Sequence, residues 1–335
     1  MKPILVSGIQ PTGALHLGNY LGALKHFVEL QNSGKYRCFF FIADLHALTQ
    51  NPDPRELKGN IENLMRAFLA AGLDPRKSTL FIQSATSFPQ ELAQVLATFT
   101  PVSELMRMTA FKEKVIQKLG KKETFEEVVE RSNFGLAEYP ILMAADIFLY
   151  DAAVVPVGDD QDQHLELART LARKFNVRFG KTFVEPKALH TDVPRLMSLD
   201  DPAKKMSKSR PAGCLFMDDS LAEIRAKFSR ATTDSGREIK YDEKDKPGVS
   251  NLLLIYSSLS GESIPALERR YTGKGYADFK DDLANVAVKT LVSYQTTKKK
   301  ISAVAAKTTF TKGTRIAIKV AQKKMVEVKK KIGLA

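Results

Sequence analysis

The sequence contains few of the features expected of a secreted, zinc-binding or membrane-spanning protein. Its only cysteines, Cys38 and Cys214, form no Cys-x-x-Cys pair, so neither a disulfide framework nor a zinc site is expected. It has no apolar run of about 18 residues, the length that a membrane-spanning helix requires. The segment from Met1 to Gly8 lacks the longer apolar stretch and the cleavage site of a signal peptide. We therefore expect a cytoplasmic protein that has no membrane partner and no protein-bound metal.

Acidic residues are almost missing from the last part of the chain. Between Asn285 and Ala335 the only acidic residue is Glu327, and this segment carries +12 of the net charge of +13. Phosphate backbones are the usual partners of such a basic segment. A solvated lysine face that only aids solubility would have the same composition, and this alternative stays open.

Alternating strand and helix patterns predict an α/β catalytic domain over residues 1–215. Short apolar runs predict buried strands at residues 3–7, 36–43, 79–82 and 153–157, with helical patterns between them. This alternation predicts a doubly wound parallel sheet of the Rossmann-like type, with helices on both faces. Over about residues 101–135 charged helices replace the strand signals, which predicts a helical insertion. Residues 216–335 show helical patterns only, which predicts a helical C-terminal domain ending in a basic tail.

Two loops carry the chemistry that the sequence suggests. The first is Gly8-Ile9-Gln10-Pro11-Thr12-Gly13-Ala14-Leu15-His16-Leu17-Gly18-Asn19, between a predicted strand and a predicted helix start. Backbone N–H groups at such a helix start favour phosphate, and His16 could donate to phosphate oxygens. The second loop is Lys204 to Ser209, flanked by Pro202 and Pro211. There Lys205 and Lys208 could converge on one polyanion such as a leaving pyrophosphate.

In this order, the two loops resemble the two signatures of class I aminoacyl-tRNA synthetases. Asn19 stands where many members carry a second histidine, a departure that is usual in the tryptophan branch. Further segments similar to the tryptophanyl-tRNA synthetases follow in the order of that family. They are Phe81 to Ser84, Arg107 to Lys112, Tyr139 to Ile147, Val155 to Gln161, and Pro247 to Leu252. The resemblance covers Lys2 to Leu283 and fades in the lysine-rich end.

The resemblance implies a role for each matching residue. The residues that would bind ATP are Gln10, Pro11, Thr12, Gly18, Asn19, Gly158, Asp159, Asp160, Leu196, Lys205, Met206, Ser207, Lys208 and Ser209. The catalytic group around the phosphates would be His16, Lys112, Lys205 and Lys208. Mg²⁺ would bridge phosphate oxygens, since this ion needs few protein ligands when phosphates supply oxygen.

Asp146 is the residue that would recognise tryptophan. Indole has one hydrogen-bond donor and no acceptor, so its pocket must present an acceptor. Asp146 lies on an otherwise apolar helix, where a carboxylate is costly unless it is paired. Read without the resemblance, it could equally be a surface residue that points to water. The resemblance adds Tyr139, Met143, Val155 and Val157 to the tryptophan-binding residues.

The resemblance implies an ATP-dependent ligase that activates L-tryptophan as an adenylate and transfers it to tRNA(Trp). It also implies a homodimer formed through the insertion and neighbouring helices. One alternative is a tyrosyl-tRNA synthetase, which shares the fold and also uses a pocket carboxylate. The other is a non-catalytic tRNA-binding paralogue. Val6 stands where many relatives place an aromatic residue of the pocket wall. His46 and His164 have no partners at metal-ligand spacing and are expected to be hydrogen-bonded structural histidines.

Overall fold

A five-stranded parallel sheet forms the centre of the protein. The computed structural model describes residues 2–117, 124–158, 161–190 and 195–334. The strands lie in the order β3-β2-β1-β4-β5, so the strand order reverses between β1 and β4. Their bounds are β1 Ile4–Ile9, β2 Arg37–Ile42, β3 Ser78–Ile82, β4 Val154–Val157 and β5 Lys187–His190. The doubly wound parallel sheet is confirmed, and β5 is a strand that the sequence analysis did not predict.

The two faces of the sheet bury two separate cores. Leu5, Phe40 and Leu80 point to one face and join the core formed with α2 (Lys25–Ser33) and α4 (Pro54–Ala70). Val6, Phe39 and Phe81 point to the other face, toward α5 (Phe88–Ala97), α9 (Gly135–Phe148) and α10 (Asp162–Phe179). Successive side chains of a strand point to opposite faces, so helices must cover both sides of these apolar strands.

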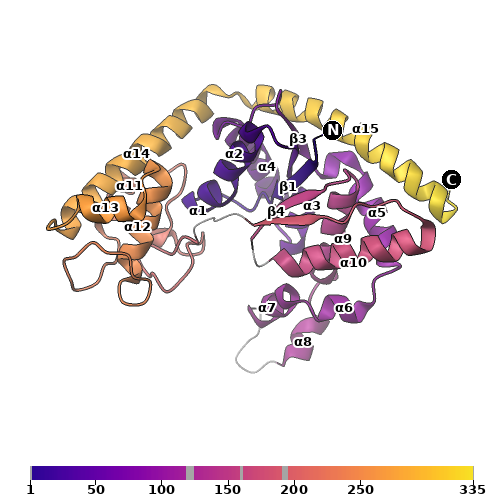
Figure 1. Ribbon diagram of the computed structural model, residues 1–335, viewed down its shortest axis with the longest axis horizontal. Coiled ribbons are helices and arrows are strands. Elements are labelled where there is room, and N and C mark those ends of the chain that lie inside the picture. The colour runs from indigo at the N-terminus through magenta and orange to yellow at the C-terminus, as the bar shows by residue number, and fades with distance from the viewer. Residues whose placement is uncertain (1, 118–123, 159–160, 191–194, 335) are drawn as a thin grey trace.

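Two groups of helices extend from this central body (Figure 1). The described part of the insertion, outside residues 118–123, contains the short helices α6 Val102–Met106, α7 Thr109–Gln117 and α8 Phe125–Glu130. The other group contains α11 Leu221–Ser229, α12 Pro247–Ser260, α13 Ile264–Arg270 and α14 Tyr276–Lys300. The loop that carries Lys205 and Lys208 leads into α11, and Met197 before this loop is hydrogen-bonded to Asn251 of α12. The second group of helices therefore contributes to the position of the loop.

The lysine-rich segment is a packed helix rather than a free basic tail. It forms α15 (Ala303–Ile332), which runs along the edge strand β3 and on toward α5 (Figure 1). Gly313 lies so close to this strand that a Cβ atom there would be 1.9 Å from the Leu80 carbonyl oxygen. The Thr314 hydroxyl accepts a hydrogen bond from the Ile82 amide at 3.3 Å. The predicted basic tail is thus a helix that packs on the sheet, because alanines and a glycine at helical spacing bury one face of the segment.

The buried side of α15 also uses one of its lysines. The Lys324 ammonium group donates to the Thr182 carbonyl at 2.9 Å and pairs with Asp151 and Glu327. By contrast, Lys312, Arg315, Lys319 and Lys323 are exposed. Their spacing places these four side chains on one face of the helix. Lys324 thus anchors α15 to the body of the protein. The other four residues form an exposed basic stripe.

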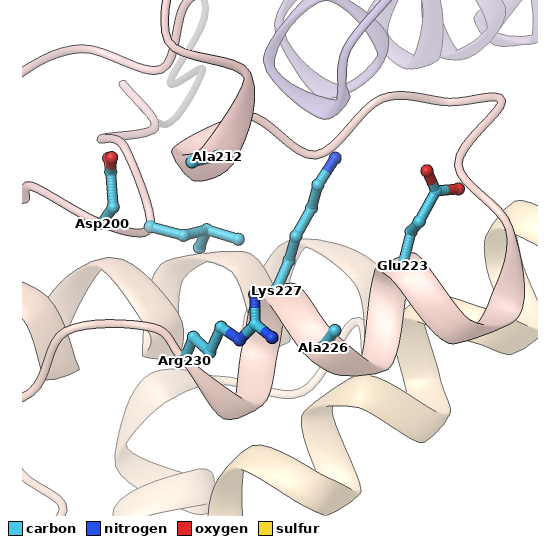
Figure 2. A pocket seen from close by; sticks show the side chains of 7 residues that line it. Asp200, Ala212, Glu223, Ala226, Lys227 and Arg230 are labelled. Atoms are coloured by element: carbon cyan, nitrogen blue, oxygen red, sulfur yellow. The ribbon is translucent and has the colours of Figure 1, made fainter.

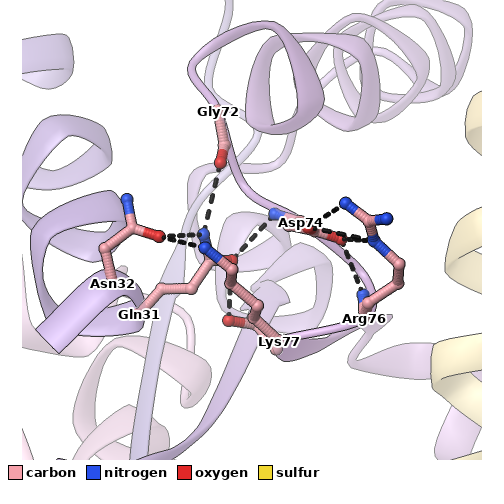
Figure 3. A network of polar contacts seen from close by, with 7 residues as sticks. Gln31, Asn32, Gly72, Asp74, Arg76 and Lys77 are labelled. Atoms are coloured by element: carbon pink, nitrogen blue, oxygen red, sulfur yellow. Dashed lines mark hydrogen bonds and ion pairs between the residues drawn. The ribbon is translucent and has the colours of Figure 1, made fainter. Parts of the chain in front are cut away.

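One buried side-chain amide, that of Gln31, organises the amino end of the sheet. The Gln31 side chain accepts hydrogen bonds from the Asp74 amide at 2.8 Å and the Ser78 hydroxyl at 2.9 Å. It also lies 3.3 Å from the Gly72 carbonyl, to which its NH₂ group donates (Figure 3). This network ties the end of α2 to the turn that enters β3. It lies at the amino end of the sheet, so it supports the fold and leaves the carboxyl end for ligands.

Candidate functional site

A short backbone ladder joins the first predicted loop to the segment that follows the second loop. The Leu17 amide donates to the Leu215 carbonyl at 2.8 Å, and the Met217 amide donates to the Leu15 carbonyl at 2.9 Å. His16 and Phe216 form the antiparallel bridge between these two bonds. Segments about 200 positions apart in the chain are therefore held side by side just beyond the carboxyl end of β1.

Lys208 closes this arrangement over the first loop. Its ammonium group donates to the Thr12 carbonyl and lies 3.4 Å from the Thr12 hydroxyl. Gly13, with a φ of +89°, has a left-handed backbone conformation that glycine adopts readily. Burial holds the pKa of Lys208 below its usual value. A phosphate group would give this half-buried ammonium group a stronger partner than a carbonyl oxygen.

His16 lies at the centre of the joined loops. Its backbone amide donates to the Asn19 side-chain oxygen at 3.2 Å, which fixes the start of α1 (Leu17–Asn19). A Cβ atom at Gly18 would lie 3.0 Å from the His16 ring, so a glycine there leaves room for the imidazole. Burial, followed by the charges of Lys208 and Lys205, lowers the pKa of His16 to about 4. At neutral pH the ring is therefore uncharged, and its buried Nδ1 atom has no hydrogen-bond partner among the described residues.

Leu196 and the segment Lys205 to Ser209 form the other wall of the candidate ATP site. The Met206 amide donates to the Leu196 carbonyl at 3.0 Å, and both side chains are buried. The Ser207 and Ser209 hydroxyls lie 2.8 Å apart, while the Lys205 side chain is exposed. The buried leucine and methionine thus anchor a loop whose polar side chains remain available.

The remaining predicted ATP-binding residues are less closely gathered. Gln10 follows β1 and accepts from Gln50 at 3.4 Å, and Gly158 lies exposed directly after β4. Pro11 is buried in the first loop. Asp159 and Asp160 lie outside the described residues.

Lys112 is the predicted residue that the structure does not bring to the loops. It lies exposed on α7 of the insertion. Within the described part of the chain its ammonium group forms no hydrogen bond or ion pair. Its role at the phosphates stays a prediction.

Asp146 is buried and held by two side chains that the sequence analysis did not assign to the site. It lies on α9 with 3% of its surface exposed. The Gln83 NH₂ group donates to Asp146 Oδ2 at 2.7 Å, and His46 Nε2 lies 2.9 Å from the same oxygen. Because a carboxylate only accepts, the His46 nitrogen must carry the proton when Asp146 is ionised. The reading of Asp146 as a surface residue is therefore wrong, and His46 is a hydrogen-bonded histidine as expected.

The second oxygen of Asp146 differs from the first. Among the described residues no hydrogen bond reaches Asp146 Oδ1, while Oδ2 receives both donors. Burial raises the pKa of Asp146, and the hydrogen bonds from His46 and Gln83 oppose that rise. The arrangement orients the carboxylate and leaves one oxygen able to accept from a ligand.

His46 and Gln83 could have been found from their positions along the chain. His46 lies on α3 (Asp44–Ala47), directly after β2, and Gln83 directly follows β3. The carboxyl ends of parallel strands meet at one edge of a sheet, where ligands bind in this class of fold. Gln83 also belongs to the segment Phe81 to Ser84 on which the family resemblance rests.

Apolar residues expected to line the pocket gather around the same helix. Tyr139, Met143 and Asp146 have the spacing of one helical face. The Tyr139 ring lies edge-on to His46, with ring centroids 6.5 Å apart, and its hydroxyl lies 2.8 Å from His164 Nε2. Val155, Val157 and Val6 of β1 belong to one apolar cluster, and Met143 packs against it. His164 is thus also hydrogen-bonded, as expected.

A separate cavity lies behind the second loop. It has a volume of about 270 Å³ and lies between residues 199–212 and α11 (Figure 2). Lys227 borders it, but the ammonium group of this residue is bound to the Cys214 carbonyl and Asp219. The chemistry of His16, Lys208 and Asp146 is found elsewhere, so the cavity is a gap beside the loop rather than the substrate site.

Comparisons with known proteins agree with this geometry. The model of the family "tRNA synthetases class I (W and Y)" matches residues 1–292. The chain therefore belongs to the class I tRNA synthetases of the tryptophan and tyrosine family.

Particular relatives point to one branch of this family. A Tryptophan--tRNA ligase of Oceanobacillus iheyensis is 50% identical over 87% of this chain and 86% of its own length. The tryptophanyl-tRNA synthetase structure from Mycoplasma pneumoniae has a TM-score of 0.89 at 36% identity, covering 100% of this chain and 99% of its own. A Campylobacter jejuni tryptophanyl-tRNA synthetase complexed with ADP and tryptophan has a TM-score of 0.81 at 34% identity, covering 98% and 99%. The recognition of the tryptophan branch is confirmed.

The lowered pKa of His16 gives a testable titration. We expect the His16 ring to titrate near pH 4, as followed by NMR and assigned with His16→Gln. Lys208→Ala should raise this pKa only partly, because burial is the larger cause and the lysine charges come second. Between pH 6.5 and 4 the unfolded chain takes up a proton that the folded ring resists, so stability is lost as the pH falls through this window.

The control is Lys299→Ala, which removes an exposed charge from α14 and should leave the His16 pKa unchanged. A titration midpoint near 6.5 in the unmodified protein would contradict the account of a buried, neutral His16.

Proposed function

We propose that this protein activates L-tryptophan with ATP and transfers it to tRNA(Trp), releasing AMP and diphosphate. The single observation that carries the choice of amino acid is Asp146, whose Oδ2 is held by His46 and Gln83 and whose Oδ1 is left to accept. An indole N–H fits this acceptor. The tryptophan ligases among the relatives and the neighbour complexed with ADP and tryptophan support the same choice.

In the first step the tryptophan carboxylate attacks the α-phosphorus of ATP, and diphosphate leaves. The nucleophile is already an anion, so alignment and electrostatic stabilisation can suffice without a general base. Lys205, Lys208 and, from the insertion, Lys112 would stabilise the negative charge of the phosphates. The neutral His16 would donate one hydrogen bond without adding charge.

The ribose and adenine would lie along the carboxyl ends of β1 and β4, where the strand order reverses. Gln10, Pro11, Thr12, Gly18 and Asn19 would contact ATP from the first loop. Gly158, Asp159 and Asp160 would contact it from the end of β4, and Leu196 through its backbone.

Mg²⁺ would arrive with the nucleotide. The described groups around Thr12 and Lys208 are ammonium groups and backbone amides, and no metal-binding cluster of three His, Cys, Asp or Glu residues occurs in the described ranges. Such a site fits a Mg²⁺ ion that is held chiefly by phosphate oxygens. The bound ion would neutralise part of the negative charge of the phosphates.

The tRNA would bind with its terminal adenosine at the site and its body along the helical part, residues 216–335. The exposed stripe of Lys312, Arg315, Lys319 and Lys323 supports a phosphate partner there.

We also propose a homodimer that acts in the cytoplasm. The insertion and its neighbourhood expose large apolar side chains, with Val102 and Phe134 each 70% exposed and Ile116 57% exposed. Such residues support a self-association surface. No helix in the described ranges is long and apolar enough to cross a membrane.

The first test is ATP–diphosphate exchange with each of the twenty amino acids. We expect tryptophan alone to stimulate exchange strongly, because the indole combines one N–H donor for Asp146 with a large apolar ring for the surrounding apolar cluster. Stimulation by tyrosine instead would favour the tyrosyl alternative. The absence of exchange with every amino acid, together with retained tRNA binding, would favour the non-catalytic paralogue.

The second test concerns tRNA binding. Replacing Lys312, Arg315, Lys319 and Lys323 together by glutamine should weaken tRNA binding and flatten its dependence on salt. The slope of log K against log salt should change by about 0.7–0.9 for each phosphate that the variant no longer neutralises. Substitution is preferable to deleting the segment, because α15 packs against β3 and its removal would expose the core.

A matched control neutralises four other exposed basic residues, Lys35, Arg55, Lys58 and Arg76. An equal loss of tRNA affinity in the control, or an unchanged slope in the α15 variant, would contradict a role for the stripe.

A further inference from the structure

One buried amide of the helical part is bonded to the backbone directly opposite Lys205. Asn251 lies on α12 with 2% of its surface exposed. Its Oδ1 accepts from the Met197 amide at 2.9 Å, and its NH₂ group donates to the Met197 carbonyl at 2.9 Å. Both hydrogen-bonding groups of one main-chain residue are thus satisfied by one side chain.

The backbone ladder explains why Met197 needs this partner. Met197 and Lys205 form an antiparallel bridge, flanked by bonds from Ser198 N to Lys204 O at 2.7 Å and from Met206 N to Leu196 O at 3.0 Å. In such a pair the amide and carbonyl of Met197 point away from Lys205. Buried backbone groups left unpaired are costly, so Asn251 takes the place that a third strand would occupy.

The same segment has a second anchor in the helical part. The Thr232 amide donates to the Leu199 carbonyl, and the Thr232 hydroxyl donates to the Asp200 carbonyl, both at 2.8 Å. Gly248 of α12 packs on Thr232 so closely that a Cβ atom would lie 2.3 Å from its carbonyl oxygen. Toward α11, Leu199 and Asp200 border the cavity of Figure 2.

The two ends of the loop are therefore fixed to different parts of the protein. The outgoing end, at Leu215 to Met217, is bonded to the first loop beside His16. The incoming end, at Met197, is bonded to α12. The position of Lys205 between these ends depends on where α12 holds Met197.

We infer that Asn251 is a positioning residue, through which α12 sets the place of Lys205 relative to the phosphates. This inference deepens the proposed function and rests on it for the identity of the reaction. Asn251 touches neither ATP nor tryptophan in this account; it acts on the lysine through the Met197 backbone. The bond pair couples the part of the chain that would bind tRNA to the loop that would release diphosphate.

The test compares Asn251→Ala and Asn251→Asp with the unmodified protein. The aspartate keeps the shape of the side chain but cannot donate to the Met197 carbonyl. We expect both variants to lower the kcat of tryptophan-dependent ATP–diphosphate exchange about tenfold or more. The KM for tryptophan should stay within about twofold, because the Asp146 pocket is untouched.

Asn176→Ala is the matched control. The Asn176 side chain also bridges backbone groups, at Thr182 and Phe183, but at the far end of α10. It should leave exchange unchanged. In the Asn251→Ala background, Lys205→Ala should add little further loss, because the lysine is already misplaced.

Limited trypsin digestion supplies a readout that does not depend on activity. Cleavage at Lys204, Lys205 and Lys208 should be faster in both Asn251 variants and unchanged in Asn176→Ala. Wild-type kcat together with wild-type cleavage would overturn the inference, as would full additivity with Lys205→Ala.

If the unmodified protein shows no exchange with any amino acid, the proposed function fails, and the cleavage comparison alone decides the role of Asn251. If Asn251→Ala does not fold, the near-isosteric Asn251→Asp decides it in the same way.

Discussion

A buried carboxylate with one oxygen occupied and one available is the constraint on which the site depends. Asp146 lies in an apolar cluster, where an unpaired charge would be costly. His46 and Gln83 offset that cost by donating to Oδ2, and in doing so they fix the direction of Oδ1. These two donors come from the ends of β2 and β3, so the order of the strands places them around α9. The proposed selection of an indole by Asp146 would in this way be a consequence of the sheet topology.

The phosphate side of the site is assembled differently. Its two loops are distant in the chain and are joined by main-chain bonds, with Lys208 reaching the Thr12 carbonyl. Desolvation, followed by the charges of Lys208 and Lys205, keeps His16 uncharged, so the ring adds no positive charge to that of the lysines. The helical part holds the incoming end of the second loop through Met197. The candidate site therefore has two parts. One is the apolar cluster around Asp146, which would bind the amino acid. The other is the polar loop with Lys205 and Lys208, which is attached to the first loop and to α12.

Much of this could be predicted from the sequence where local patterns reflect local structure. The strands near residues 3–7, 36–43, 79–82 and 153–157 were predicted because they are continuous apolar runs, and the parallel sheet follows from their alternation with helices. β5 was missed because Lys187–His190 is short and only partly buried, which leaves no apolar run. The packing of α15 was not predicted, because its buried face consists largely of small residues, alanine and glycine, within thirty residues that are rich in lysine. Such a face gives only a weak apolar pattern. The positions of His46 and Gln83 after β2 and β3 place both residues at the carboxyl edge of the sheet, but their pairing with Asp146 depends on contacts between distant segments. The bond from Asn251 to Met197 likewise joins distant segments, and no local pattern indicates it.

The most direct measurement compares tryptophan with its benzothienyl analogue, in which sulfur replaces the indole N–H. The quantity to measure is kcat/KM for ATP–diphosphate exchange, in the unmodified protein and in Asp146→Ala. We predict that the unmodified protein prefers tryptophan by about a hundredfold or more, since the analogue leaves a buried carboxylate oxygen unpaired. We also predict that Asp146→Ala loses most of this preference while its KM for ATP changes little. A preference that persists undiminished in Asp146→Ala would show that Asp146 does not read the indole N–H, and would contradict the central claim.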